Sequence, residues 1–365
     1  MHRVHLTYTL QGRDDPQRDL HHPLLVLLAA VHTSGSISGA ARRLAMSYRH
    51  VWGELKRWET ELGRPLVLWA KGQPALLSPF GEKLLWAERR AQARLAPQVE
   101  ALRGELERAF AVAFDDAAGV ITLSASHDEA LPLLRQWAQD EHRLHLDIQF
   151  GGSIAALQAL NEGRCLLAGF HALPDAPAHS PTARAYRALL RPGRHKLVGF
   201  ARRTQGLIVA PGNPLALREP ADLLRPGLRF VHRTLGAGTR VLLEELLARA
   251  HARPADLPEI VPPEASHRAA AEAVASGHAQ ATLGIEAAAR ALGLGFVPLV
   301  EEHYFLVALR PTLEHPHVKA LLALLQGQAW QSRLATLPGY GAERSGEVLP
   351  LRRVLPWWNY RKPKP

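Results

Sequence analysis

The sequence contains one cysteine, Cys165, among 365 residues. A single thiol cannot form an intramolecular disulfide, and it cannot supply the ligands of a cysteine-based zinc finger. The 19 histidines are scattered with no HxxxH spacing, so we expect neither a structural metal nor a cofactor. Hydrophobic cores must therefore hold the chain together, and a hydrophobic content of 47% is ample for two or three domains.

Long apolar runs are also scarce. The run at residues 24–31 is too short to span a bilayer, and it follows the acidic residues Asp14, Asp15 and Asp19. We therefore predict no membrane segment and no export signal, and we expect the protein to act in the cytoplasm.

Charge of one sign is not spread evenly along the chain. Residues 1–113 contain 16 Lys and Arg against 11 Asp and Glu, residues 114–350 contain 23 of each, and residues 351–365 contain five cations and no acid. This distribution predicts three parts with these boundaries, of which one end contacts phosphate while the neutral body has another task. The tail interleaves Trp357, Trp358 and Tyr360 with cations, which fits either stacking on nucleic acid or packing of the tryptophans on the body.

Residues 34–59 contain two short helical segments joined by a tight turn. Ser36 or Ser38 can cap the first helix and Ser47 the second, and Gly63 lies where the second helix should end. An apolar stripe with spacings of four and three follows the second helix at Val51, Leu55, Trp58 and Leu62. The stripe packs inward and leaves a basic face free, which is typical of a helix-turn-helix that reads DNA, although a helical hairpin can also be purely structural.

The next residues predict a wing and a long helix. Strands at residues 66–69 and 75–77 flank a turn that carries Lys71, and a helix is expected from residue 79 to about 110. Leu95, Val99, Leu102, Leu106 and Ala109 repeat at the seam spacing of a coiled coil, although Pro97 interrupts the pattern and predicts a kink. The leucines therefore indicate either a dimerisation helix or a helix that packs within its own domain.

The segment from Ile37 to Leu44, followed by MSYRHVW, resembles the winged helix of the molybdenum-responsive ModE-type regulators, which are relatives of LysR-type proteins. The resemblance covers about the first 110 residues. It implies that the second helix enters the major groove, that the wing lies over the DNA backbone, and that homodimers or higher homo-oligomers bind double-stranded DNA. The expected DNA contacts are Ser36, Ser38, Ser47, Tyr48, Arg49, His50, Lys56 and Lys71.

Short strands and helices alternate from residue 120 onward, which predicts an α/β domain with a mostly parallel sheet. Hydroxyl or glycine residues precede four of the helices, at residues 126–128, 151–153, 234–240 and 264–267. Helix N-termini of this kind bind small anions when several converge, whereas each serine taken singly fits an ordinary N-cap. Asp128 would repel an anion unless it faces away from the site.

Residues 115–345 resemble the cytosolic relatives of periplasmic molybdate- and tungstate-binding proteins, through pieces such as ASHD, HRTLGAGTR and EASHRAAAEAVASG. The resemblance implies a two-lobed, type II periplasmic-binding-protein-like fold with crossovers near residues 197–202 and 297–306. It also implies a ligand between the lobes: molybdate, tungstate, another oxyanion, a carboxylate such as formate, or a molybdenum cofactor fragment. The expected ligand contacts are Ser126, His127, Gly152, Ser153, His171, Gly238, Thr239, Arg240, Ser266, His267 and Tyr304.

Together these features predict a ligand-responsive transcriptional regulator that is not an enzyme. Its domains are a winged helix-turn-helix with a dimerisation helix (1–113), a two-lobed ligand-binding domain (114–350) and a basic tail (351–365). Two alternatives remain open: a carrier of an oxyanion or cofactor that binds no operator, and an enzyme that uses His127 and Asp128 as a catalytic pair.

Overall fold

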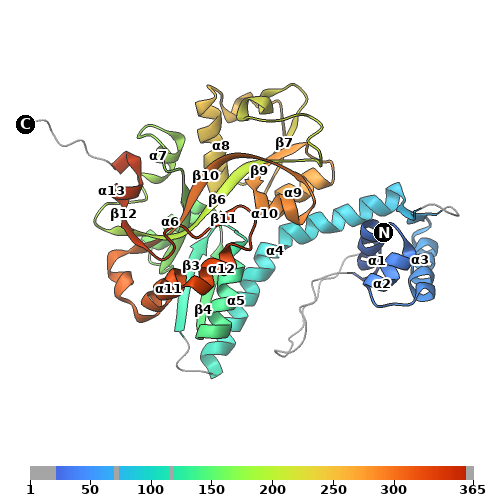
Figure 1. The fold of residues 1–365 in the computed structure, drawn as a ribbon, viewed down its shortest axis with the longest axis horizontal. Helices are drawn as coiled ribbons and strands as arrows, with labels where there is room; N and C mark the ends of the chain where they lie inside the picture. The colour runs from blue at the N-terminus through green and yellow to red at the C-terminus, as the bar shows by residue number, and fades with distance from the viewer. Residues whose placement is uncertain (1–21, 70–73, 115–118, 359–365) are drawn as a thin grey trace, which may run out of the picture. The chain divides into compact units, whose positions relative to one another are not determined.

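A computed structural model describes residues 22–69, 74–114 and 119–358 (Figure 1). The chain divides into two compact units, Met1–Gln92 and Ala93–Pro365. The division falls inside one long helix, α4 (Pro79–Phe114). Each unit is described by itself, and the domain boundaries at residues 113 and 350 stay predictions.

Three helices form the N-terminal unit: α1 (Pro23–Ser34), α2 (Ile37–Arg43) and α3 (Tyr48–Leu62). The predicted caps are present, because Ser36 Oγ accepts from the amide of Gly39 and Ser47 Oγ accepts from the amide of His50. Gly63 ends α3 in the left-handed conformation with φ 66°. The core of this unit includes Val51 and Leu55 from the predicted stripe, while Trp58 and Leu62 pack against it half-buried.

The wing consists of two short antiparallel strands, β1 (Val67–Leu68) and β2 (Leu76–Leu77). The predicted turn with Lys71 lies outside the described residues. Ser78 then caps α4 through the amide of Gly81, as the sequence predicts. The helix continues through Pro97 to Phe114.

A curled mixed sheet forms the centre of the C-terminal unit, with the path β4-β3-β5-β10-β6-β9-β7-β8 and two short strands added to β6. Its strands are β3 (Gly119–Ala125), β4 (Leu144–Phe150), β5 (Leu167–Ala172), β6 (His195–Val209), β7 (Arg229–Arg233), β8 (Glu259–Glu264), β9 (Ala281–Ile285), β10 (Gly295–Leu309), β11 (Tyr340–Gly341) and β12 (Val348–Pro350).

The strands β6 and β10 are the two crossovers that join the lobes. Both are 15 residues long and they pair antiparallel along their whole length, with register shifts next to Pro298 and Tyr304. One end of the pair borders β5, and the other end borders β9. The crossover positions at residues 197–202 and 297–306 lie within these strands. The prediction of a mostly parallel sheet was wrong, because the parallel pairs are confined to each lobe and the long crossovers are antiparallel.

Helices cover both faces of the sheet (Figure 1). Successive side chains of β6 point to opposite faces of the sheet, and both faces are covered: Leu207 and Val209 belong to one core cluster and Ile208 to another. The helices of this unit after α4 are α5 (Ala130–His142), α6 (Ser153–Asn161), α7 (Pro181–Tyr186), α8 (Gly238–Arg249), α9 (His267–Ala275), α10 (Glu286–Ala291), α11 (Pro316–Gln326), α12 (Gln328–Leu334) and α13 (Leu351–Val354). Short 3-10 helices lie at Pro220–Leu224, Pro254–Asp256, Arg310–Glu314 and Pro356–Trp358.

The tail begins by packing on the body. Trp357 is buried in a core cluster, and the guanidinium of Arg187 lies 5.4 Å from the ring centre of Trp358. This favours the packing interpretation over nucleic-acid stacking for these two tryptophans, whereas Tyr360 lies outside the described residues.

Across the described ranges, no single helix is long and apolar enough to cross a membrane. The helices α1 and α2 qualify only when taken together, and they bend by 116° at the break between them.

Candidate functional sites

The exposed face of the N-terminal unit carries most of the predicted DNA contacts. Tyr48, Arg49 and His50 form the first turn of α3 and all three are exposed. Ser38 is exposed on α2, and two further exposed arginines, Arg42 and Arg43, end that helix. Cations at these places can contact phosphates, while the start of α3 is the part of such a helix that reaches base edges.

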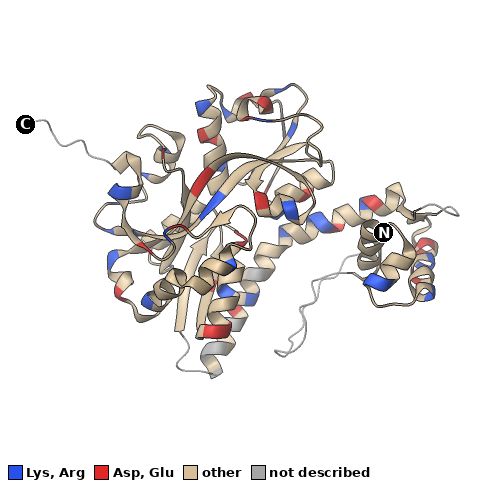
Figure 2. Cartoon of the chain, viewed as in Figure 1, with Lys and Arg blue, Asp and Glu red and all other residues tan. Residues whose placement is uncertain are grey.

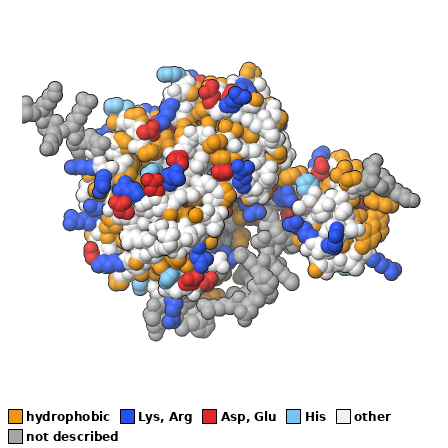
Figure 3. Space-filling model, viewed as in Figure 1, with side chains coloured by type: hydrophobic (Ala, Val, Ile, Leu, Met, Phe, Trp, Pro, Cys, Tyr) orange, Lys and Arg blue, Asp and Glu red, His pale blue; other side chains and the backbone are white. Residues whose placement is uncertain are grey.

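An aromatic cluster organises the middle of α3. The rings of Tyr48 and Trp52 stack with centroids 6.4 Å apart, and Trp69 of the wing meets Trp52 edge-on at 6.1 Å. The ammonium of Lys56 lies 4.8 Å from the Trp52 ring centre and forms an ion pair with Glu59 at 2.7 Å. Lys56 therefore already has an ion pair and a ring contact, whereas the described residues provide neither for Arg49. Hydrophobic side chains gather on one edge of this unit (Figure 3). The exposed large hydrophobic residues of the unit are Met46, Tyr48, Leu68, Trp69 and Leu76.

The side chain of Glu59 connects α3 to the start of the wing by hydrogen bonds. Its Oε1 accepts hydrogen bonds from the backbone amides of Leu66 and Val67 at 2.7 and 3.2 Å. Burial alone would raise the pKa of this carboxyl, but the hydrogen bonds from Lys56 and the two amides lower it overall. The charged carboxylate therefore holds the start of β1 at neutral pH.

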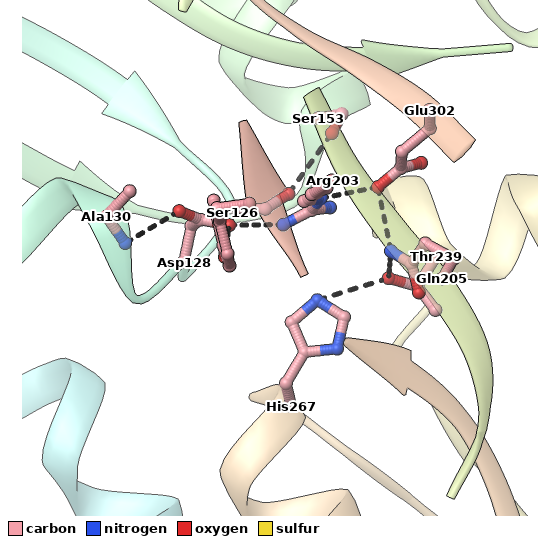
Figure 4. A network of polar contacts seen from close by, with 10 residues as sticks. Ser126, Asp128, Ala130, Ser153, Arg203, Gln205, Thr239, His267 and Glu302 are labelled. Atoms are coloured by element: carbon pink, nitrogen blue, oxygen red, sulfur yellow. Dashed lines mark hydrogen bonds and ion pairs between the residues drawn. The ribbon is translucent and has the colours of Figure 1, made fainter. Parts of the chain in front are cut away.

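A buried polar network lies in the C-terminal unit where the crossovers meet the loops that precede the helices (Figure 4). Arg203 of β6 is 1% exposed and forms ion pairs with Asp128, which follows β3, and with Glu302 of β10. Figure 2 shows this pairing of basic residues on β6 with acidic residues on β10 at the centre of the sheet. The hydroxyl of Tyr340 also donates to Asp128, at 2.7 Å. Asp128 is thus occupied by protein groups, which argues against the catalytic pair with His127.

The network continues into the second lobe. Gln205 Nε2 donates to Glu302 at 2.8 Å and to the hydroxyl of Thr239 at 3.4 Å. That hydroxyl lies 3.4 Å from Nε2 of His267, at the start of α9. The hydroxyls of Ser126 and Ser153 lie 3.1 Å apart in the first lobe.

Two glycines let the lobes come into contact. A Cβ at Gly152 would lie 2.6 Å from the carbonyl oxygen of Gly236, a residue with φ 81°. A Cβ at Gly238 would lie 2.6 Å from the ring of His171. A cavity beside this contact, lined partly by His171, Gly238 and Glu302, measures about 10 Å³, which is room for one water. The protein's own side chains thus fill most of the predicted gap, and a polyatomic anion needs the lobes to separate.

The predicted ligand contacts divide into two groups. The structure brings one group together on facing elements: Ser126, Gly152, Ser153, His171, Gly238, Thr239, His267 and Tyr304. His127 lies at its edge, with its ring 5.0 Å from that of Phe150. Ser266 caps α9 through the amide of Ala269 and contacts the carbonyl of Ala93, so its hydroxyl has a structural use. Arg240 points toward Glu244 at 3.6 Å.

The histidines of this group are neutral at physiological pH. Burial lowers the pKa of His171 well below its ordinary value, and the charges of Arg203 and Arg233 lower it further. Burial also lowers the pKa of His267 well below its ordinary value, with additional contributions from Arg233 and Arg203. Neutral imidazoles can donate or accept hydrogen bonds without adding charge to the site.

Sequence reasoning missed Arg203, Gln205, Arg233 and Glu302. Arg203 and Gln205 lie two apart on a strand, so the alternation of side chains could have placed them on one face. Their exposure near zero could not be foreseen, because arginine is rarely buried unless it is paired.

The segment that follows β8 connects this site to the long helix. Glu264 forms two hydrogen bonds to Arg94 of α4, at 2.6 and 2.8 Å, and its backbone carbonyl accepts from Arg233 at 3.2 Å. The next two residues continue the link, because the carbonyl of Ala265 accepts from Arg233 and Ser266 contacts Ala93. Taken together, these three consecutive residues contact both α4 and Arg233.

Two family models match the chain. The PBP superfamily domain matches residues 134–326, and the bacterial regulatory helix-turn-helix protein, lysR family, matches residues 23–82.

Among curated proteins, the uncharacterized protein YvgK of Bacillus subtilis is 31% identical over 201 residues, which are 55% of this chain and 64% of that protein. The molybdenum-pterin-binding protein MopB of Rhodobacter capsulatus is 40% identical over 67 residues, which are 17% of this chain and 25% of MopB. The chain thus spans less than two thirds of the length of either relative.

Among the solved structures that this chain matches is OxyR of Corynebacterium glutamicum, in a cysteine variant bound to hydrogen peroxide. It has a TM-score of 0.45 and 18% identity, and the match covers 86% of this chain and 93% of that one. Full-length CbnR in complex with its target DNA has a TM-score of 0.40 and 17% identity, covering 81% of this chain and 98% of that one.

Proposed function

The chain belongs to the PBP superfamily and carries a helix-turn-helix of the lysR family, and from this combination we propose that it is a LysR-type transcriptional regulator. In this proposal the N-terminal unit binds double-stranded DNA and the two-lobed domain binds a small effector. The observation that carries the proposal is the presence of both family matches in one chain. The lysR family model describes regulatory proteins, in agreement with the expectation that the chain is not an enzyme.

The effector in this proposal is a small anion. Buried hydroxyls and neutral imidazoles converge from both lobes, and the fully buried Arg233 adds positive charge. One relative is named a molybdenum-pterin-binding protein, which supports molybdate, tungstate or a molybdenum cofactor fragment over formate. The small cavity implies that binding separates the closed lobes, and the ligand shifts the two arrangements only by its differential affinity for them.

The oligomeric state in this proposal is a homodimer or a higher homo-oligomer formed through α4. Four large apolar side chains of this helix remain exposed in the single chain: Val99, Leu102, Leu106 and Phe110. Three of them have the spacing of a helix seam, and a symmetric pair of reading helices can reach two half-sites on DNA. We propose that the protein performs this task in the cytoplasm.

A carrier that binds the same anion but no operator is the second candidate. The exposed basic face of the N-terminal unit favours the regulator, because a carrier does not need unpaired cations around a helix-turn-helix. A gel-shift titration of the full chain with the DNA upstream of its own gene separates the two. Retardation at physiological salt supports the regulator, and no retardation of this or any other duplex supports the carrier.

The sharper test replaces Arg49 by alanine. We expect Arg49→Ala to weaken operator binding about tenfold, since it removes one phosphate or guanine contact, and to leave anion-induced thermal stabilisation intact. Arg57→Ala is the matched control, because Arg57 is on the same helix but pairs with Glu54 and lies over Trp58. Equal operator affinity of Arg49→Ala and the wild type would refute the assigned role of Arg49.

A further inference from the structure

Arg233 is a buried guanidinium with an unused nitrogen. It lies at the end of β7 and is 4% exposed. Its Nε donates to the carbonyl of Glu264 at 3.2 Å and its Nη2 to the carbonyl of Ala265 at 2.8 Å. Its Nη1 is buried and has no acceptor among the described residues. Two neutral carbonyls therefore fix the plane of the guanidinium, and no carboxylate among the described residues pairs with it directly, although the charges of Asp128 and Glu264 act on it from further away.

The second buried arginine of the site, Arg203, also has a buried nitrogen, Nη2, with no acceptor among the described residues, but its charge is balanced. Two carboxylates, Asp128 and Glu302, neutralise Arg203. The carboxylate nearest in sequence to the carbonyls that hold Arg233 is Glu264, and Arg94 already pairs with it. An isolated buried charge is costly unless something pairs with it, so the fold keeps Arg233 ready for a negative group.

The surroundings of Arg233 are the residues expected to bind a ligand. Its charge acts on the rings of both His171 and His267. Nδ1 of each ring is buried without a partner in the part of the chain that the structure describes, and His267 lies beside the hydroxyl of Thr239. These neutral groups supply hydrogen bonds, and Arg233 supplies the charge.

We propose that Arg233 holds the negative charge of the effector, with Nη1 donating to one oxygen of a small oxyanion or carboxylate placed among His171, Thr239 and His267. This inference rests on the proposed function, and it adds Arg233 to the contacts that the sequence suggested. Arg240 stays a predicted contact: it lies in the first turn of α8, and its Nε is buried 3.6 Å from Glu244 with no hydrogen-bond partner among the described residues.

The test compares two glutamine variants of the full chain by isothermal titration with molybdate, tungstate and formate. We expect Arg233→Gln to weaken binding of the anion that the wild type prefers by about 10- to 100-fold, the range for loss of a charge-assisted hydrogen bond. Arg229→Gln is the matched control and retains wild-type affinity, because Arg229 lies on the same strand and also donates to two backbone carbonyls, but at the surface. Equal binding by Arg233→Gln and the wild type overturns this inference alone, whereas a wild type that binds none of the three anions overturns the proposed effector class as well.

A second measurement guards against a variant that fails to fold. Arg233→Met removes the two hydrogen bonds to the carbonyls of Glu264 and Ala265 together with the charge, so its melting temperature without added anion should lie a few degrees below that of the wild type. Added anion should raise the melting temperature of the wild type and not that of the folded Arg233→Met variant. An equal rise for the two proteins would overturn the inference.

Discussion

The two candidate sites place their polar side chains in opposite environments. On the N-terminal unit, Tyr48, Arg49 and His50 are exposed and stand on a single helical turn. In the C-terminal unit, Ser153, His171 and Arg233 are at most 4% exposed and come from three separate elements. An exposed face can meet a large partner without rearrangement, whereas a buried site binds a small ligand only if the protein opens. The comparison predicts that changes in the first site alter affinity for DNA alone, and that changes in the second alter the stability of the fold as well.

The largest expected effect comes from breaking the buried network. Arg203→Met leaves Asp128 and Glu302 buried without their cation, which should cost about 3–5 kcal/mol in the free energy of unfolding. The neighbour Arg202 is the matched control, since it pairs with Glu301 and Glu343 at the surface and Arg202→Met should cost less than about 1 kcal/mol. Urea denaturation followed by tryptophan fluorescence measures both. Equal costs for the two variants would contradict the distinction between buried and exposed charge.

An intermediate effect is expected at the contact between the lobes. Gly152→Ala places a methyl group 2.6 Å from the carbonyl oxygen of Gly236, and this backbone atom cannot move aside cheaply. We expect the variant to disfavour the closed arrangement and to change anion affinity about tenfold, because the open and closed populations change.

Gly151→Ala provides the control for this variant. A Cβ at Gly151 meets no atom within 4 Å. The two adjacent substitutions therefore differ only in whether they touch the other lobe. A Gly151→Ala variant that altered anion affinity as much as Gly152→Ala would show that the glycines act through chain flexibility instead.

The smallest effect is expected from pH. His171 and His267 have pKa values below those of unfolded histidine, so between about pH 6.5 and the lower folded value the unfolded chain binds more protons than the folded one. The contribution of these two histidines to the free energy of unfolding is therefore fully present above about pH 6.5, and it falls as the pH decreases toward 5. Melting temperatures between pH 7.5 and 5.5 measure this slope, which His267→Gln should make shallower. Stability that rises on acidification through this range would contradict burial as the cause.

Local patterns predicted most of the N-terminal unit. The caps Ser36 and Ser47, the stop at Gly63 and the stripe at Val51 and Leu55 depend on neighbours in sequence, so their roles follow from spacing. The helix entrances of the two-lobed domain were found for the same reason. Each of these features joins residues within one or two helical turns, where neighbours in sequence are also neighbours in the structure.

The buried arginines could not be predicted in this way. Arg203 is paired with residues that lie 75 and 99 positions away, and those partners become neighbours only when β6 and β10 cross between the lobes. Arg240 was predicted because it lies in the first turn of a helix, which is a local feature, and its role in ligand binding stays a prediction. Long-range register decides which charges meet, and the local pattern of a strand does not contain that information.

The short segment Glu264 to Ser266 links the helix α4 to the candidate ligand site. On one side it grips α4 through Arg94 and Ala93, and on the other it carries the carbonyls that orient Arg233. A movement of the guanidinium toward a bound anion therefore also moves the backbone of the segment that contacts the helix. Ligand binding in the cleft would then be coupled to the position of the long helix through three consecutive residues.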